Sequence, residues 1–111
     1  MQEMKSTVKR DKSLPLSETV YYILLALLKP AHGYIIMQKV EELSDGQVRM
    51  AAGTLYGALE TLLRRNFIKP VQTDDNRRKV YVITDEGKRI LRLDCQRMSH
   101  MIRITRKEGL Q

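Results

Sequence analysis

The chain has 111 residues, of which 42% are hydrophobic and 30% are charged. This length allows one small domain, and this hydrophobic fraction argues against a chain that is disordered throughout. Lysines and arginines number 20 against 13 aspartates and glutamates, and the resulting net charge of +7 predicts a polyanionic partner, nucleic acid ahead of an anionic membrane surface.

No segment of the sequence is predicted to enter or cross a membrane. The first 13 residues are polar and lack the apolar run of a signal peptide. The longest apolar run, residues 20–28, is far shorter than a membrane span. The single cysteine, Cys95, allows no internal disulfide and fits a reducing compartment. We therefore expect a cytoplasmic protein.

Residues 1–13 are predicted to form a flexible basic arm. Its cations are Lys5, Lys9, Arg10 and Lys12. Such an arm either reaches along a nucleic-acid backbone or is a disordered tail, and the sequence leaves both interpretations open.

Two helices are predicted to follow the arm. The first begins at residues 15–17 and ends before Pro30, and its middle is apolar on every side, so other elements must cover it. Residues 29–33 are predicted to be a connector. The second helix, residues 34–44, is apolar on one face and is ended by the turn formers Asp45 and Gly46.

Residues 50–68 predict a third helix with two unlike faces. Leu55, Leu59 and Leu62 recur at i, i+4 and i+7 and form a narrow apolar seam. The opposite face is small at one end and basic at the other, and consists of Thr54, Gly57, Ala58, Thr61, Arg64 and Arg65. Asn66, which tolerates a positive φ, is predicted to end the helix. A face this free of bulk suits entry into a groove, although an ordinary solvated face is the alternative.

After the third helix the hydrophobic period becomes that of strands. Residues 67–73 and 79–84 are β-prone and flank the turn-forming, basic stretch DDNRR, which predicts a two-stranded hairpin. Pro70 confines its strand to a sheet edge. Thr84 is the predicted N-cap of a last helix that runs from Asp85 to about Arg106.

This order of elements is that of a winged helix-turn-helix, so the predicted fold class is mainly α with a small β-hairpin. In such a fold the third helix enters the DNA major groove, and Arg64 and Arg65 reach phosphates at its far end. The basic turn, Arg77, Arg78 and Lys79, then lies along the backbone or minor groove. The alternative that helix order alone leaves open is a small α+β domain without a nucleic-acid role.

Three segments carry a family resemblance: HGYIIMQKVEEL, GTLYGALETLLRRNFI and RRKVYVITDEGKRIL. In this order and spacing they resemble the PadR family of bacterial transcriptional regulators, specifically its short members, which combine a winged helix with one C-terminal helix. The resemblance covers roughly residues 14–92. It implies a homodimer that binds an operator as a repressor and is released by a small-molecule or stress signal.

The resemblance also implies roles for single residues. The recognition-helix motif of the family is matched by Thr54, Tyr56 and Gly57, and the opening of its second helix, which commonly faces DNA phosphates, by His32, Gly33 and Tyr34. The basic turn at residues 77–79 matches its wing. Two positions depart from the pattern, because Ala52 and Asn66 stand where relatives often carry proline and glycine, and both departures affect helix ends rather than DNA-contacting groups.

The last helix argues for a dimer independently of the resemblance. Its apolar arc is wider than the arc usual for a surface helix, and a second copy can bury it in a two-fold interface. The expected interface residues are Tyr21, Tyr22, Ile90, Leu91, Met98, Met101 and Ile102. Two-fold symmetry sets two recognition helices about 34 Å apart and so predicts a palindromic site. The alternative is a helix that folds back on its own domain.

Residues 14–84 are therefore the predicted DNA-binding domain, and residues 85–111 the dimerisation helix and tail. Few residues suit an enzyme. His32 and His100 lie on different elements, and Cys95 lies five residues before His100, a poor helical spacing for a shared metal. No phosphate-loop or Ser/His/Asp pattern stands out. We expect no catalysis, no cofactor and no metal.

An effector site is harder to predict. Tyr21, Tyr22, Met98 and Met101 could line a pocket between subunits, but a plain dimer core is the favoured interpretation. Apolar surroundings predict that Cys95 is a buried, unreactive thiol. The function expected from the sequence is a sequence-specific DNA-binding repressor. The alternatives are an architectural, nonspecific DNA-binding protein and a protein–protein adaptor that uses the same scaffold.

Overall fold

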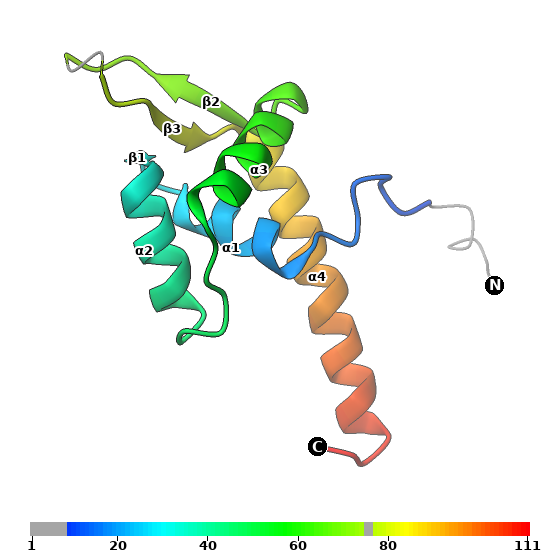
Figure 1. The fold of residues 1–111 in the computed structure, drawn as a ribbon. Coiled ribbons are helices and arrows are strands. Elements are labelled where there is room, and N and C mark those ends of the chain that lie inside the picture. Colours follow the sequence, from blue (N-terminus) through cyan, green and yellow to red (C-terminus); the bar gives the residue numbers. More distant parts are fainter. Residues whose placement is uncertain (1–8, 75–76) are drawn as a thin grey trace.

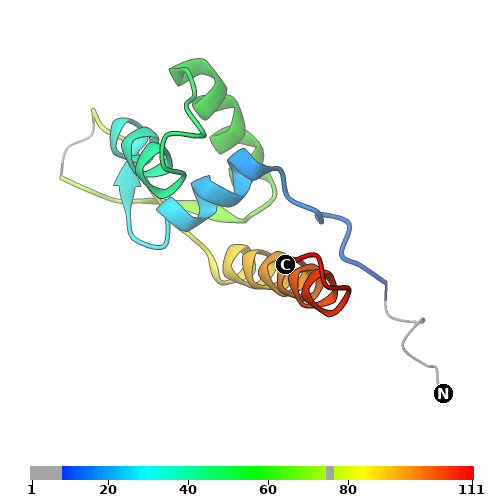
Figure 2. The same cartoon turned by 90° about the horizontal axis from the view of Figure 1, so that it is seen from below.

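A computed structural model describes residues 9–74 and 77–111 of the chain. The elements in chain order are α1 (Glu18–Ala26), β1 (Ala31–His32), α2 (Gly33–Leu43), α3 (Ala52–Arg64), β2 (Ile68–Val71), β3 (Val80–Ile83) and α4 (Asp85–Lys107). α1 lies between α2 and α4, and the β2–β3 hairpin projects from the body as a wing (Figure 1 and Figure 2). The predicted fold class, mainly α with a small antiparallel sheet, is confirmed.

Local sequence signals set the beginnings and ends of the helices largely as expected. Thr84 caps α4, because its side chain accepts a hydrogen bond of 3.0 Å from the Gly87 N–H. Asn66 has a φ of 64° directly after α3, and Asp45 and Gly46 have positive φ values in the turn after α2. α1 ends at Ala26, earlier than Pro30 requires, and the carbonyl oxygen of the next residue, Leu27, accepts a hydrogen bond of 2.9 Å from the Ile83 N–H of β3.

The predicted connector at residues 29–33 is wrong in one respect, because it contains a strand. β1 pairs antiparallel with β3, with Ala31 opposite Tyr81 and His32 opposite Val80. The sheet therefore has the order β1-β3-β2, and Pro70 lies on edge strand β2 as predicted. A strand of two residues has no period to detect, and only its distant partner β3 defines it.

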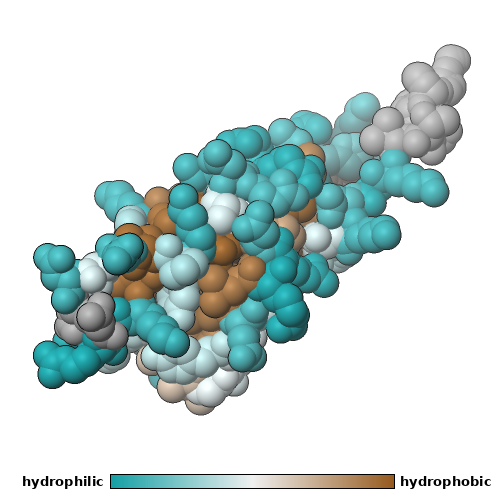
Figure 3. Space-filling model, turned by 90° about the horizontal axis from the view of Figure 1, so that it is seen from above, coloured by the Kyte–Doolittle hydropathy of each residue, from teal (hydrophilic) through white to brown (hydrophobic). Residues whose placement is uncertain are grey.

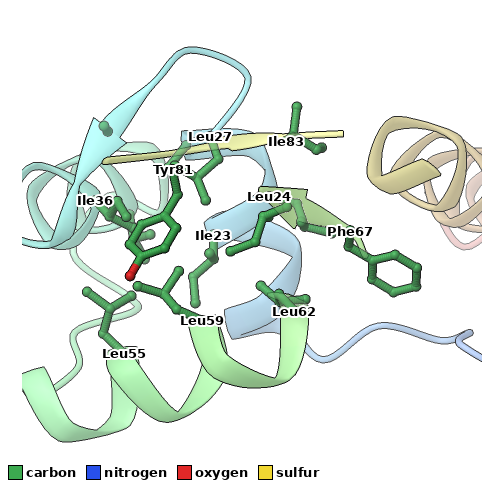
Figure 4. Close-up of a cluster of buried hydrophobic side chains, with 14 of the residues drawn as sticks. Ile23, Leu24, Leu27, Ile36, Leu55, Leu59, Leu62, Phe67, Tyr81 and Ile83 are labelled. Carbon is green, nitrogen blue, oxygen red and sulfur yellow. The ribbon is translucent and has the colours of Figure 1, made fainter. Parts of the chain in front are cut away.

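The core lies between α1, α2, α3 and the inner face of the sheet, and the first half of α4 adds to it (Figure 4). The predicted seam of α3 is confirmed, because Leu55, Leu59 and Leu62 are buried. They pack in one cluster with buried residues of the other elements, chiefly Ile23, Leu24, Leu27, Ile36, Val40, Phe67, Ile68, Tyr81 and Ile83. Truncation of one such leucine to alanine costs about 2–5 kcal/mol, so this cluster fixes how α3 is presented.

α4 has two unlike halves. Its first half packs on the body: a β-carbon on Gly87 would clash with the Phe67 carbonyl oxygen, and Ile90 and Leu91 are 1% and 7% exposed. The second half extends away from the body (Figure 1). The prediction that Ile90 and Leu91 lie in a dimer interface is therefore corrected, since the core of the same chain covers them.

The segment before α1 is attached to the first half of α4. Asp11 and Glu86 both contact the Arg89 guanidinium, at 3.3 and 2.7 Å. The carboxylate of Asp94, only 1% exposed, pairs with Arg97 at 2.6 Å and accepts from the Leu16 N–H at 3.3 Å. The end of the predicted flexible arm is thus held against α4, while residues 1–8 lie outside the described residues.

Cys95 is exposed, so the prediction that this thiol is buried is wrong for the single chain. It lies against Tyr21 of α1, where burial, with a smaller contribution from Cys95, raises the pKa of Tyr21 to about 12. Within residues 9–74 and 77–111, no cluster of three or more His, Cys, Asp or Glu side chains is placed to hold a metal ion. In the same residues, no helix is both long and apolar enough to span a membrane.

Candidate nucleic-acid interface

Three distant segments of the chain meet in one groove. It lies between the start of α2, the first half of α3 and wing residues 77–79, which come just before β3, and its volume is about 670 Å³. The lining residues are His32, Gly33, Tyr34, Ile35, Tyr56, Arg77, Arg78 and Lys79. No carboxylate is among these described lining residues, so the groove is electropositive and suits an anion.

The start of α2 contributes backbone donors to this groove. His32 precedes the helix in extended conformation, and its side chain does not cap the helix. The first N–H groups of α2 therefore have no side-chain cap, and the positive end of the helix dipole lies at the groove, an arrangement that favours an anion. The imidazole of His32 instead contacts the wing, with its Nε2 3.3 Å from Nη1 of Arg78.

α3 presents the bare face that its sequence predicts. At Gly57, apart from its chain neighbours and the adjacent backbone of α3, no atom of the described residues lies within 4 Å of the position that a β-carbon would take. Thr54 is exposed one turn earlier. Thr61 is exposed too, its hydroxyl donating to the Gly57 carbonyl oxygen at 3.2 Å and accepting from Arg64 at 3.4 Å. The face is therefore small, polar and accessible, as entry into a DNA groove requires.

The structure groups most of the predicted DNA-binding residues, but not all. His32, Tyr34, Tyr56, Arg77, Arg78 and Lys79 line the groove. Thr54, Gly57, Thr61 and Arg64 lie on the adjoining exposed face of α3. Arg65 is set apart, because its guanidinium lies 3.5 Å from the Ser13 hydroxyl, before α1.

In the space-filling view, hydrophilic residues surround the tip of the wing, and an apolar patch lies farther along the molecule (Figure 3).

Sequence reasoning missed two features of the groove. Ile35 contributes to the lining, and the pairing of β1 with β3 brings His32 to the wing. Neither has a local signal, since both depend on contacts between residues far apart in the chain.

A family model for the transcriptional regulator PadR-like family matches residues 22–93 of the chain. The chain belongs to this family. The winged helix of the PadR-like chain therefore has the architecture expected of a DNA-binding regulator, and the predicted family resemblance is confirmed.

Solved PadR-like structures have the same fold. A transcriptional regulator from Clostridium thermocellum is 26% identical, with a TM-score of 0.65 over 81% of this chain and 92% of that one. Bacillus subtilis PadR, solved in complex with operator DNA, is 28% identical, with a TM-score of 0.56 over 66% of this chain and 44% of that one.

A curated relative is an uncharacterised 37.1 kDa protein of transposon TN4556 from Streptomyces fradiae, 29% identical over 72 residues. The match covers 65% of this chain, but the chain spans only about a fifth of the length of that relative (20%). This PadR-like chain therefore corresponds to one part of a longer protein in that case.

Proposed function

We propose that the chain is a sequence-specific transcriptional repressor that binds a palindromic operator as a homodimer. The observation that carries the proposal is the groove, where the start of α2, Tyr56 of α3 and the basic wing converge without a carboxylate among the described lining residues. The operator complex of Bacillus subtilis PadR, a relative of 28% identity, supports DNA as the partner.

In the proposed complex, α3 enters the major groove. Thr54 and Gly57 face the base edges, since small residues let the backbone approach closely. Arg64 reaches phosphates at the far end of the helix. The backbone N–H groups at the start of α2 and the wing residues Arg77 and Arg78 bind phosphates on either side, which orients α3 in its groove.

The second half of α4 is the proposed dimer contact. Met101, Ile102 and Ile104 are 45%, 46% and 44% exposed on a helix that extends beyond its own domain. Met98, Tyr21 and Tyr22, which are half-buried, complete the proposed interface. A two-fold pairing of α4 helices would remove this apolar surface from water and set two copies of α3 about one DNA turn apart.

The proposal includes the cytoplasm as the site of action and an effector of unknown chemistry that controls release. It includes no catalytic step. Two other functions are outcomes that experiments can reveal: an architectural DNA-binding protein would lack sequence preference, and a protein–protein adaptor would lack salt-dependent affinity for DNA.

The wing offers the sharpest test of the proposed DNA contact. In a salt series, Arg77→Ala combined with Arg78→Ala should weaken binding to all duplexes and reduce the slope of log affinity against log salt by about 2. The matched control is Arg92→Ala combined with Arg103→Ala, which removes the same charge from exposed positions of α4 outside the groove. Equal slopes for the two double variants would contradict the wing assignment.

A further inference from the structure

Residues 11–14 form a turn shortly before α1. The Leu14 N–H donates to the Asp11 carbonyl oxygen at 3.0 Å, and the Ser13 N–H donates to Oδ1 of Asp11 at 2.8 Å. The other carboxylate oxygen of Asp11 lies 3.3 Å from the Arg89 guanidinium of α4. One aspartate therefore closes the turn and attaches it to the body, and its negative charge is paired with the positive charge of Arg89.

The turn lies beside the end of α3. Lys12 and Ser13 of the turn line a pocket of about 280 Å³ together with Thr61 and Arg65 of α3. Lys12 and Arg65 are exposed, and the Arg65 guanidinium lies 3.5 Å from the Ser13 hydroxyl. No carboxylate is among the described residues that line this pocket. Two cations and two hydroxyl groups therefore make it a small electropositive site that suits an anion.

This pocket continues the exposed face of α3. Thr61 follows Gly57 by one turn of the helix, and Arg65 follows Thr61 by one more. The segment before α1 and the β2–β3 wing extend from opposite sides of the body (Figure 1 and Figure 2). Because the two DNA strands border the major groove, a helix inserted there has phosphates on both of its sides. The wing and the turn are therefore placed to face different phosphates.

We propose that Lys12, Ser13 and Arg65 form a second phosphate-binding site, which holds DNA on the side of α3 away from the wing. This site rests on the proposed function and extends its contact with the duplex. The two cations donate to phosphate oxygens, and the Ser13 hydroxyl supplies a third donor. Asp11 and Arg89 are positioning residues, since they touch no DNA and hold Lys12 beside Arg65.

Interference by phosphate ethylation tests whether the two sites contact different phosphates. The probe is a duplex from upstream of the chain's own gene, in which ethylation of a contacted phosphate blocks binding. Lys12→Ala combined with Arg65→Ala should remove the interference at one set of phosphates, and Arg77→Ala combined with Arg78→Ala at another set. Interference that the first double variant leaves unchanged, or that both variants lose at the same phosphates, would overturn the proposal.

A salt series counts the contacts on any duplex. Lys12→Ala combined with Arg65→Ala should reduce the slope of log affinity against log salt by about 2 and lower the affinity at least about tenfold near physiological salt. The matched control is Arg92→Ala combined with Arg103→Ala, which removes the same charge from exposed positions of α4 and should keep the slope. Equal slopes for these two double variants would overturn the proposal.

Asp11→Ala distinguishes an ordered site from a diffuse basic tail. Removal of a carboxylate makes the chain more positive, so a diffuse tail would bind DNA more tightly. Release of the turn should instead lower the affinity by at least about threefold, because Lys12 must then be ordered on binding. Glu108→Ala, which removes an exposed carboxylate after α4, is the control and should not lower the affinity. A rise in affinity for Asp11→Ala would overturn the proposal.

These experiments separate the second site from the proposed function. The ion pair of Asp11 with Arg89 is partly exposed and contributes little to stability, so each variant should fold, which circular dichroism checks. Failure of the unchanged chain to bind any DNA would overturn the proposed function and the second site together. Specific binding by the unchanged chain, with the salt slope and phosphate contacts retained after Lys12→Ala and Arg65→Ala, would overturn the second site alone.

Discussion

α3 and the second half of α4 both present a face that their own chain leaves accessible, but the chemistry of the two faces is opposite. The face of α3 is small and polar and adjoins a groove lined by three wing cations. The face of α4 carries half-exposed methionine and isoleucine side chains. A polar surface is well solvated by water and needs no cover. Burial of an apolar surface, by contrast, contributes about 25 cal/mol per Å² to the free energy of association. Under the proposed function, the first face binds DNA and the second binds another copy of the chain.

The comparison predicts that each face can be disabled without the other. The largest effect on DNA recognition should come from Gly57→Phe, which adds bulk to the face of α3 where, apart from chain neighbours and the adjacent backbone of α3, no atom of the described residues lies within 4 Å of an added β-carbon. We expect a loss of specific operator affinity of at least about 100-fold, since the backbone can no longer approach the bases.

The same variant should leave the dimer and the fold intact. Circular dichroism and analytical ultracentrifugation check both. Retention of operator binding by Gly57→Phe would show that this face does not enter the groove.

The reciprocal variant combines Met101→Glu with Ile102→Glu. Charges buried in an apolar interface are costly, so we expect a monomer at micromolar concentration and operator affinity reduced by about 100-fold through loss of the second half-site. Sedimentation measures the mass, and anisotropy measures the affinity. Ser99→Glu, on an exposed position of the same helix, is the control. A dimer that survives the double change would move the interface elsewhere.

The first half of α4 should respond to substitution in a third way, through stability alone. Asp94→Ala removes the partner of Arg97 and leaves the Leu16 N–H without its acceptor. Because Arg97 keeps access to water, we expect a cost of about 2 kcal/mol in the free energy of unfolding. Urea denaturation measures this cost, with Gln96→Ala as the exposed control. Loss of the dimer at unchanged stability would contradict the assignment.

The smallest predicted effect is the release, at acid pH, of the segment before α1 from its contact with α4. The Ser13 backbone N–H and then Arg89 hold the pKa of Asp11 below its usual value, and Arg89 does the same for the pKa of Glu86. Because the folded-state pKa values are depressed, the contacts are complete above the unfolded values, about pH 4–5, and are lost as the pH falls further. The amide signal of Ser13 should report release of the segment in that range. Arg89→Gln should release it at neutral pH.

Local signals account for most of what could be predicted from the sequence. The cap at Thr84, the left-handed Asn66 and the seam of α3 are decided within one turn of the chain, and the structure confirms them. β1 and the cover over Ile90 depend on partners far away in the sequence, so their positions could not be predicted from local patterns.

The candidate site divides in the same way. Charge predicted the wing cations Arg77, Arg78 and Lys79, because a basic turn has a compositional signature, whereas the family resemblance predicted His32, Tyr34 and Tyr56. The contact between Gly33 and Tyr56 has no such signature, since a glycine at the start of a helix is compatible with many neighbours. Only the packing of α2 against α3 places the tip of the Tyr56 side chain beside that position.

The most direct test of the central claim is fluorescence anisotropy with a labelled duplex from upstream of the chain's own gene and a scrambled duplex of the same composition. The account predicts binding that is at least about 1,000-fold tighter for the native duplex, with two chains bound per site. Equal, steeply salt-dependent affinity for both duplexes, or affinity for neither at low salt, would contradict it.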